Sequence, residues 1–220
     1  MTSIIGATLI DGTGRAPVPD SVVLVVGSRV GEAGPRASVP TPARAVNVNG
    51  AGKFVTPQLI DLNRDELPVA STNDELRKLI ESGAAAYGGL PEDIDPVLLA
   101  RLIDSKAVFA PGLSQLNGRA LERAKQQTRK LADAGLRIAV ASAGDPEHEL
   151  KLLLEAGFSP MEVIVAATHN GALAQRKSHE VGTLTSGKYA NLVLLPTDPL
   201  EDVCGLARPE RIMVEGRWVD

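Results

Sequence analysis

The chain has 220 residues, a length that allows one large domain or two small ones with a sizeable core. Hydrophobic residues make up 44% and aromatic residues only 3%, so the core must consist mostly of Ala, Val, Leu and Ile. The net charge of −4 argues against a nucleic-acid-binding surface, and no apolar run is long enough to span a bilayer.

The N-terminal part of the chain predicts β-strands joined by turns. The apolar run at 22–26 is too short for a helix and has the continuous character of a strand buried on both faces. Gly12 and Gly14 mark a turn after the first strand, because glycine tolerates positive φ. Strands are expected at 4–10, 22–26, 29–32 and 45–49, with a proline-rich loop at 35–42.

The stretch 55–65 follows this β-rich part and reads Val-Thr-Pro-Gln-Leu-Ile-Asp-Leu-Asn-Arg-Asp. Residues 59–62 predict a short, mostly apolar strand. This strand runs directly into the polar residues at 63–65, which would form its tip. The segment at 67–71 could add a further strand.

Beyond this stretch the pattern changes to alternating helices and strands. Residues 72–75 and 159–162 have the spacing of capping boxes, and Pro96 and Pro146 each follow an aspartate at a helix start. Helices are expected at 72–83, 97–103, 119–134, 146–156 and from 160 onward, and strands at 84–87, 107–110 and 137–142. This alternation predicts parallel strands joined by right-handed crossovers.

The C-terminal part returns to β-structure, with an apolar strand at 192–195 and a strand or hairpin at 211–219. Its one cysteine, Cys204, allows no disulfide within the chain. The N-terminus lacks the order of basic, apolar and small residues that marks a signal peptide. A cytoplasmic location is therefore expected, with no nucleic-acid or membrane partner.

Two stretches resemble signature segments of one superfamily. Residues 57–65 resemble the first barrel strand of the metal-dependent amidohydrolases, Pro-Gly-Leu-Ile-Asp-Leu-His-x-His, with Gln58 in place of the glycine. Residues 182–217 resemble the C-terminal signature of Gly-x-Leu-x-x-Gly-Lys-x-Ala-Asp-Leu-Val, Asp-Pro-Leu and Val-x-Gly-Arg, with Asn191 for the usual aspartate. The chain is thus identified as a shortened, degenerate member of this superfamily, in its imidazolonepropionase/prolidase-like branch.

The resemblance implies an α/β fold with a truncated (β/α) barrel fragment at 57–179. A small composite β-sandwich domain would be built from both termini, 1–56 and 180–220. A full barrel takes roughly 250 residues, whereas about 125 residues separate Pro57 from Gly182. The three strands expected after residue 83 then correspond to barrel strands six, seven and eight. Such a fragment has open edges, which a homo-oligomeric partner is expected to cover.

The family's metal site lies at the C-terminal ends of the barrel strands. The two strand-one histidines are replaced by Asn63 and Asp65, and Gly88 stands for the strand-six histidine. Ser142 and Ala143 stand for the Thr-Asp pair of strand eight. Zinc, which the family would imply, needs at least three ligands of imidazole, thiolate or carboxylate type. The sequence therefore predicts no metal and no cofactor, and leaves Asn63, Asp65, Gly88 and Ser142 as candidate binding residues for a small molecule.

A relocated site is the alternative. Asp145 and His148 follow the strand-eight tip, and with Asp65 they are candidate catalytic residues. In the competing interpretation Asp145 caps the next helix and His148 lies on its exposed first turn. His169 lies in a segment that resembles the family's Ala-Thr-x-Asn-Pro-Ala helix end, and His179 precedes a glutamate in a polar loop.

Family resemblance implies a hydrolase acting on carbon–nitrogen bonds other than peptide bonds. The replaced metal ligands predict a non-catalytic relative that binds a ligand or a partner, or serves as an assembly subunit. The alternative is an active cyclic-amide hydrolase with a relocated or dimer-completed site. A third reading is a degenerate gene product whose fold survives without a function.

Overall fold

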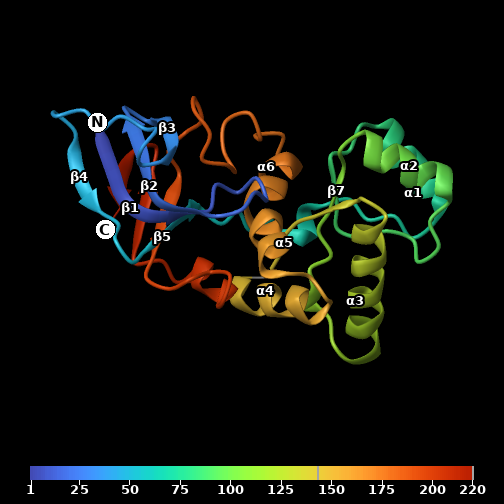
Figure 1. Ribbon diagram of the computed structural model, residues 1–220. Coiled ribbons are helices and arrows are strands. Elements are labelled where there is room, and N and C mark those ends of the chain that lie inside the picture. The colour runs from blue at the N-terminus through green and yellow to red at the C-terminus, as the bar shows by residue number, and fades with distance from the viewer. Residues whose placement is uncertain (143, 220) are drawn as a thin grey trace. The chain divides into compact units, whose positions relative to one another are not determined.

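The structure is a computed structural model that describes residues 1–142 and 144–219. The chain forms two compact units, Met1–Leu59 with Lys177–Asp220 and Ile60–Arg176. Strands from both chain ends build the first unit, and alternating short strands and helices build the second (Figure 1). The fold is therefore mixed α/β, as the sequence predicted.

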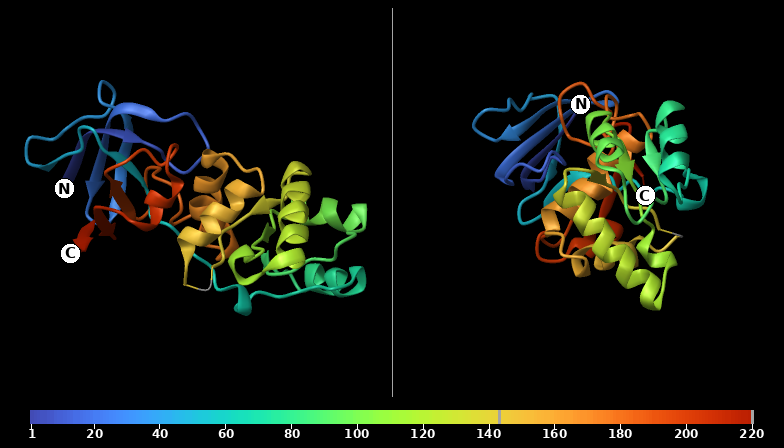
Figure 2. Two further views of the ribbon diagram at one scale, coloured as in Figure 1. Left: turned by 90° about the horizontal axis from the view of Figure 1, so that it is seen from below. Right: turned by 90° about the vertical axis from the view of Figure 1, so that its right-hand side faces the viewer.

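An eight-stranded sheet forms the first unit, in the order β11-β10-β9-β5-β1-β2-β3, with β4 paired to β1. The N-terminal and C-terminal strands meet where β5 pairs antiparallel with β9, and Figure 2 shows them side by side. The strands are β1 Thr2–Leu9, β2 Val18–Val26, β3 Arg29–Pro35, β4 Val46–Asn49, β5 Phe54–Pro57, β9 Leu192–Leu195, β10 Arg211–Val214 and β11 Arg217–Val219. Strands expected at both ends of the chain thus share one continuous sheet.

The core of this sheet joins strands that are far apart in its order. Ile4 of β1, Val23 of β2 and Met213 of β10 are fully buried in one apolar cluster. The run Ser21–Val25 is buried at every position, as expected for a strand covered on both faces. Asn191 accepts a hydrogen bond from the Glu215 N–H at 2.7 Å, so this departure from the family pattern holds the β10–β11 turn.

The second unit is built on a parallel sheet of β6, β7 and β8. Val69 adds a single parallel bridge to Gly89 beyond β6. The strands are β6 Ala86–Tyr87, β7 Val108–Phe109 and β8 Arg137–Ile138, and the helices are α1 Asn73–Glu81, α2 Pro96–Asp104, α3 Gly118–Asp133, α4 Pro146–Glu155, α5 Pro160–Val165 and α6 Gly171–Ala174. Short turns η1 Arg64–Glu66, η2 Leu113–Gln115 and η3 Ala166–Asn170 complete the second unit, and η4 Val203–Ala207 belongs to the first.

Helix starts follow the predicted caps, with one difference. Ser159 and Glu162 form the expected capping box at α5, and Asp95 caps α2 ahead of its first-turn proline. At α1 the Thr72 side chain accepts from the Glu75 N–H, but the Glu75 carboxylate accepts from the Ser71 N–H instead of that of Thr72. The predicted capping box at α1 is therefore only half formed.

The strand expected at 59–62 is not a regular strand. The Ile60 N–H donates to the Ala167 carbonyl at 2.7 Å, and the Leu62 N–H donates to the Val140 carbonyl at 3.0 Å. Ala167 lies in the π-helical turn η3, which interrupts the regular α-helical hydrogen bonding between α5 and α6. The segment is extended, but one of its two acceptors comes from a helix instead of a neighbouring strand, so no β-ladder forms.

The same π-turn corrects the placement of His169. The sequence placed His169 at a helix end, whereas α5, η3 and α6 follow one another without a break and His169 lies inside η3. Gly171 opens α6 directly against Ile60, because a Cβ built on Gly171 would lie 2.8 Å from the Ile60 Cβ. Because Gly171 has no side chain, the backbone of the helix can lie directly against Ile60 of segment 60–62.

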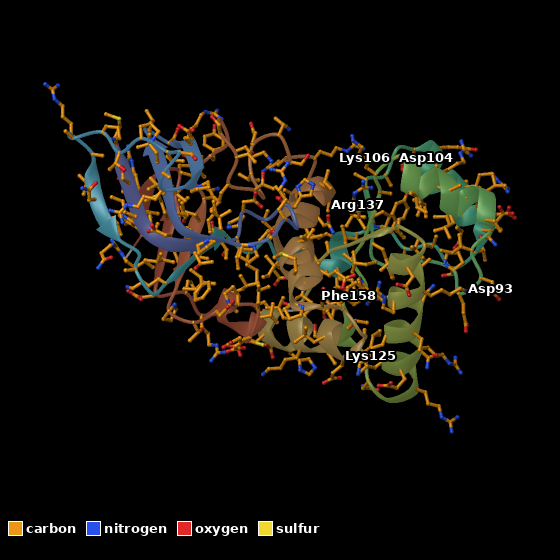
Figure 3. The ribbon with its side chains drawn as sticks, viewed as in Figure 1. Asp93, Asp104, Lys106, Lys125, Arg137 and Phe158 are labelled. Carbon is orange, nitrogen blue, oxygen red and sulfur yellow. The ribbon has the colours of Figure 1, made fainter. Side chains whose placement is uncertain are left out.

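Charged residues lie on the surface around α1 and α2. Asp93, Asp104 and Lys106 are all exposed there (Figure 3). Within residues 1–142 and 144–219, every helix is too short or too polar to cross a bilayer.

Candidate functional site

The candidate site lies where the strands of the second unit end. Parallel strands place their C-terminal ends at one edge of a sheet, where βα-barrel proteins carry their sites. In this unit these ends are followed by Gly88 after β6, Ala110 after β7 and Ser142 after β8. The extended segment 60–62 leads into Asn63 beside them, since its Leu62 bonds to Val140.

Asn63 and Asp65, which the sequence resemblance matches to the family's histidine pair, flank and enter a single turn of 3₁₀ helix. The Asn63 carbonyl oxygen Oδ1 accepts from the Asp65 N–H at 3.2 Å, and its Nδ2 donates to Glu66 Oε1 at 2.9 Å. Both residues are exposed. Asn63 therefore caps the turn η1, and Asp65 points its carboxylate to solvent.

Ser142 is held by a carboxylate that the sequence had not singled out. Asp61 accepts from the Ser142 N–H at 2.7 Å and from the Ser142 hydroxyl at 2.6 Å. The Ser142 Oγ also accepts from the Gly144 N–H at 3.2 Å, and Ser142 is buried. The pair ties segment 60–62 to the end of β8. Ala143, the other expected strand-eight residue, lies outside the described residues.

Glu149 is a second carboxylate near these ends, and unlike the partly buried Asp61 it is fully buried. It is 0% exposed and accepts from the Leu113 N–H at 3.0 Å and the Ser114 N–H at 2.7 Å. Burial raises the pKa of Glu149, the two N–H donors oppose the rise, and the charge of Asp61 adds to it. Glu149 holds the loop that follows β7 against α4. A glutamate followed by Leu150, Leu152 and Leu153 was the only sequence signal for it.

Gly88 contacts the chain itself. The Arg64 Nε–H donates to the Gly88 carbonyl at 3.1 Å. A Cβ on Gly88 would lie 3.0 Å from the Arg64 carbonyl oxygen and 3.2 Å from the Leu67 Cβ. Gly88 thus lies beneath the turn η1, and Arg64 is a residue of this site that sequence reasoning missed.

The relocated candidates are not gathered into a site. Asp145 Oδ1 accepts from the His148 N–H at 3.1 Å, so Asp145 caps α4, and His148 is exposed on its first turn. Asp65 lies on the separate turn η1. His179 is exposed and lies 3.8 Å from Glu180, in the first unit. The capping interpretation of Asp145 is the one the structure shows.

The residues at the strand ends do not fit a zinc ion. Asn63 is engaged in its own turn, Gly88 offers no side chain, and the Ser142 hydroxyl is bonded to Asp61. Zinc requires three or more imidazole, thiolate or carboxylate donors converging on one point. Across the ranges 1–142 and 144–219, His, Cys, Asp and Glu form no group of three that could hold a metal ion.

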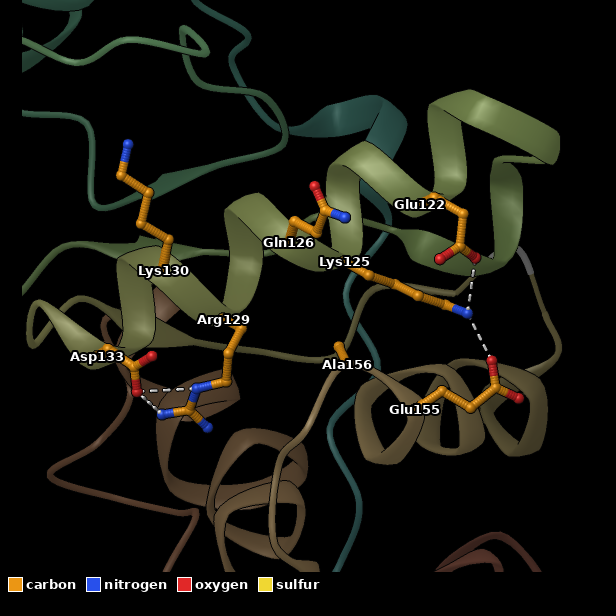
Figure 4. Close-up of a pocket in the computed structure, with 8 residues that line it drawn as sticks. All are labelled: Glu122, Lys125, Gln126, Arg129, Lys130, Asp133, Glu155 and Ala156. Atoms are coloured by element: carbon orange, nitrogen blue, oxygen red, sulfur yellow. Dashed lines mark hydrogen bonds and ion pairs between the residues drawn. The ribbon is translucent and has the colours of Figure 1, made fainter.

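A separate groove of about 510 Å³ runs along α3 and α4 (Figure 4). Most of its charges are paired with one another: Lys125 contacts Glu122 at 3.2 Å and Glu155 at 2.5 Å, and Arg129 contacts Asp133. The hydrogen bond to Glu155 raises the pKa of Lys125, which therefore stays protonated. Lys130 also lines the groove and makes no ion pair there within the described residues, but no nucleophile or carboxylate faces it, so we assign no chemistry to the groove.

Comparison with known proteins gives one family match. The amidohydrolase family model matches residues 67–219. The imidazolonepropionase of Brevibacillus brevis is 29% identical over 157 residues, which cover 56% of this chain and 37% of that protein. The adenine deaminase of Leuconostoc citreum is 34% identical over 83 residues, 35% of this chain and 14% of that protein. The chain thus spans little more than a third of the imidazolonepropionase it resembles.

Solved structures share the fold. The structure of molinate hydrolase superposes with a TM-score of 0.78 at 13% identity, covering 100% of this chain and 94% of that one. A Xaa-Pro dipeptidase with bound methionine in its active site superposes with a TM-score of 0.75 at 12% identity, covering 100% and 99%. At such low identity the likeness concerns the fold alone.

Proposed function

The chain belongs to the amidohydrolase family, and we propose that it binds a small molecule at its strand ends without hydrolysing it. The reaction class associated with this family is the hydrolysis of carbon–nitrogen bonds. Such a reaction requires a group that would activate the attacking water, either a metal ion held by side chains or a general base. This chain keeps the scaffold of the family and has exchanged the groups that perform that step.

The observation that carries the proposal is the identity of the residues at the strand ends. Asn63 caps the turn η1, and Asp65 lies within that turn. Gly88 has no side chain, and the Ser142 hydroxyl donates to Asp61. A hydrolytic water needs a metal ion or a poised base beside it. Because none of these groups supplies either, binding without turnover is the function that the site supports best.

We further propose that the second unit is a shortened barrel whose open sheet edges are covered by a second copy of the chain. Its parallel sheet has three strands, and the exposed Val69 lies beyond β6. Unpaired strand edges favour association. The single cysteine suits a reducing compartment, and we place the function in the cytosol.

A catalytic alternative is favoured by the relatives' names, which are those of hydrolases and a deaminase. It would be a cyclic-amide hydrolase whose site is completed across a dimer by Asp65, Asp145 and His148. This alternative requires association. A well-folded monomer in sedimentation at micromolar concentration would therefore remove both the dimer and the completed site.

Turnover of cyclic amides by the full chain, with and without added zinc, tests the proposal. We expect the rate with the chain to equal the buffer rate in both conditions, because no residue of the site can hold the ion or activate water. Asp65→Asn is the matched control for the catalytic alternative. A zinc-stimulated rate that this substitution lowers at least roughly a hundredfold, as loss of a catalytic acid or base does, would overturn the proposal.

A further inference from the structure

Arg64 lies across two glycines at neighbouring strand ends. A Cβ built on Gly112 would lie 2.2 Å from the Arg64 Cδ and 3.2 Å from its Cγ. A Cβ built on Gly88 would lie 3.3 Å from the Arg64 Cγ. A side chain at Gly112 would collide with the aliphatic stem of Arg64, and one at Gly88 would press tightly against it. The two glycines therefore form a cradle that fits this side chain.

The guanidinium is oriented but only partly used. Its Nε–H donates to the Gly88 carbonyl at 3.1 Å, which fixes the plane of the group. Its two Nη groups make no hydrogen bond or ion pair within the described part of the chain, and Arg64 is half-buried. An arginine held by its stem and its Nε keeps the pair of Nη groups available as a planar fork.

The carboxylates around Arg64 are engaged elsewhere or lie beyond ion-pair distance. Asp61 is bonded to Ser142, and Glu149 to the Leu113 and Ser114 N–H groups. Glu66 accepts from Asn63. Asp65 is exposed and, like the other described carboxylates, makes no ion pair with Arg64. Among the described residues, the positive charge of Arg64 thus has no counterion at the strand ends.

We propose that the Arg64 guanidinium binds the carboxylate of a small-molecule ligand, end-on through its two Nη groups. The Gly88–Gly112 cradle holds the arginine where the family's strand-end metal ligands are missing, so an organic cation takes over the role of a fixed positive charge. A monoanion suits this place better than a dianion, because Asp65 and Glu66 flank Arg64. The inference rests on the proposed ligand-binding function and names its ligand class.

Two-dimensional amide NMR of the full chain tests the inference, with sodium acetate as the probe and sodium chloride at equal ionic strength as the reference. We expect acetate to shift the Gly88 and Gly112 amides to saturation and chloride to leave them unchanged. Arg64→Gln should weaken acetate binding roughly ten- to a hundredfold, the range for a charged hydrogen-bond pair. Arg64→Lys, which keeps the charge without the fork, should lose part of the affinity.

Arg119→Gln is the matched control, because Arg119 is an exposed arginine on α3 and should leave acetate binding unchanged. Equal, unsaturable shifts with acetate and chloride would overturn the inference on the unsubstituted chain alone, even if Arg64→Gln fails to fold. Tighter binding of inorganic phosphate than of acetate would overturn the carboxylate assignment. Metal bound at the strand ends would instead refute the proposed function, so the two failures are distinguishable.

Discussion

At the scale of single residues, the two carboxylates Asp61 and Glu149 accept hydrogen bonds from backbone N–H groups. Asp61 accepts both the N–H and the hydroxyl of Ser142, and Glu149 accepts two N–H groups of the loop after β7. Glu149 is fully buried and Asp61 is partly buried. A carboxylate that accepts two donors away from solvent is a structural acceptor, because removing it leaves N–H groups unsatisfied. These two carboxylates are thus unavailable as ligands for a cation.

The pH dependence of stability follows from Glu149. Burial raises its pKa above the ordinary value of 4.5, so the folded chain binds this proton more tightly than the unfolded chain. The stability that Glu149 contributes is therefore complete below the unfolded pKa and is lost as the pH rises through the folded pKa. Glu149→Gln removes this titration and leaves one of the two N–H groups without an acceptor.

Urea unfolding across the acidic range measures this effect. Glu149→Gln should be less stable than the unsubstituted chain by about 1–3 kcal/mol near the ordinary pKa of a glutamate, and the difference should shrink as the pH rises. The exposed Glu92→Gln serves as the control and should show no such trend. A difference that stays constant or grows with pH would contradict this account of Glu149.

At the scale of elements, the helix α5–η3–α6 and segment 60–62 are fitted to one another. The π-turn presents the Ala167 carbonyl to the Ile60 N–H, and Gly171 lets the helix approach Ile60. The Asn170 side chain donates to the Ile138 carbonyl at 2.8 Å at the end of β8. This helix therefore forms hydrogen bonds with both segment 60–62 and the end of β8.

Gly171→Ala tests this fit, because two effects oppose each other. Alanine in place of a helical glycine gains about 1 kcal/mol of helix propensity. A Cβ at 2.8 Å from the Ile60 Cβ and 3.1 Å from its carbonyl oxygen must move backbone, which costs about 1–3 kcal/mol. We expect a net loss of stability in urea unfolding, whereas the exposed Gln175→Ala should be near neutral. A stabilised Gly171→Ala would show that the helix does not pack as described.

Local signals in the sequence predicted most elements, and long-range contacts account for the differences. Ser159 with Glu162, and Asp95 before Pro96, fix helix starts from neighbouring residues alone. The strand expected at 59–62 does not form, because one of its hydrogen-bond acceptors is a carbonyl of the helical turn η3. This acceptor lies far along the chain, so the local sequence gives no sign of it.

The site was predictable only in part for the same reason. The family resemblance predicted Gly88 and Ser142 at strand ends, and both follow strands of the parallel sheet. Arg64 and Gly112 were missed because nothing in their own neighbourhoods shows that they meet. Asp61 was read as a strand residue, and its bond to Ser142 appears only in the fold.

At the scale of the whole molecule, the two chain ends share one sheet, and the alternating strands and helices between them form a second compact unit. The fold of the chain is that of the amidohydrolase structures with which it superposes. The proposal that its strand ends bind a ligand without hydrolysing it concerns the side chains at those ends and leaves the fold unchanged.

The zinc content of the full chain, purified after growth with added zinc, tests the central claim most directly. We predict less than about 0.1 zinc ion per chain, because binding needs at least three suitable donors at one point. Asp65→Ala should leave that low value unchanged. A content near one zinc ion per chain that falls when Asp65 is replaced by alanine would contradict the claim that these strand ends no longer hold a cation.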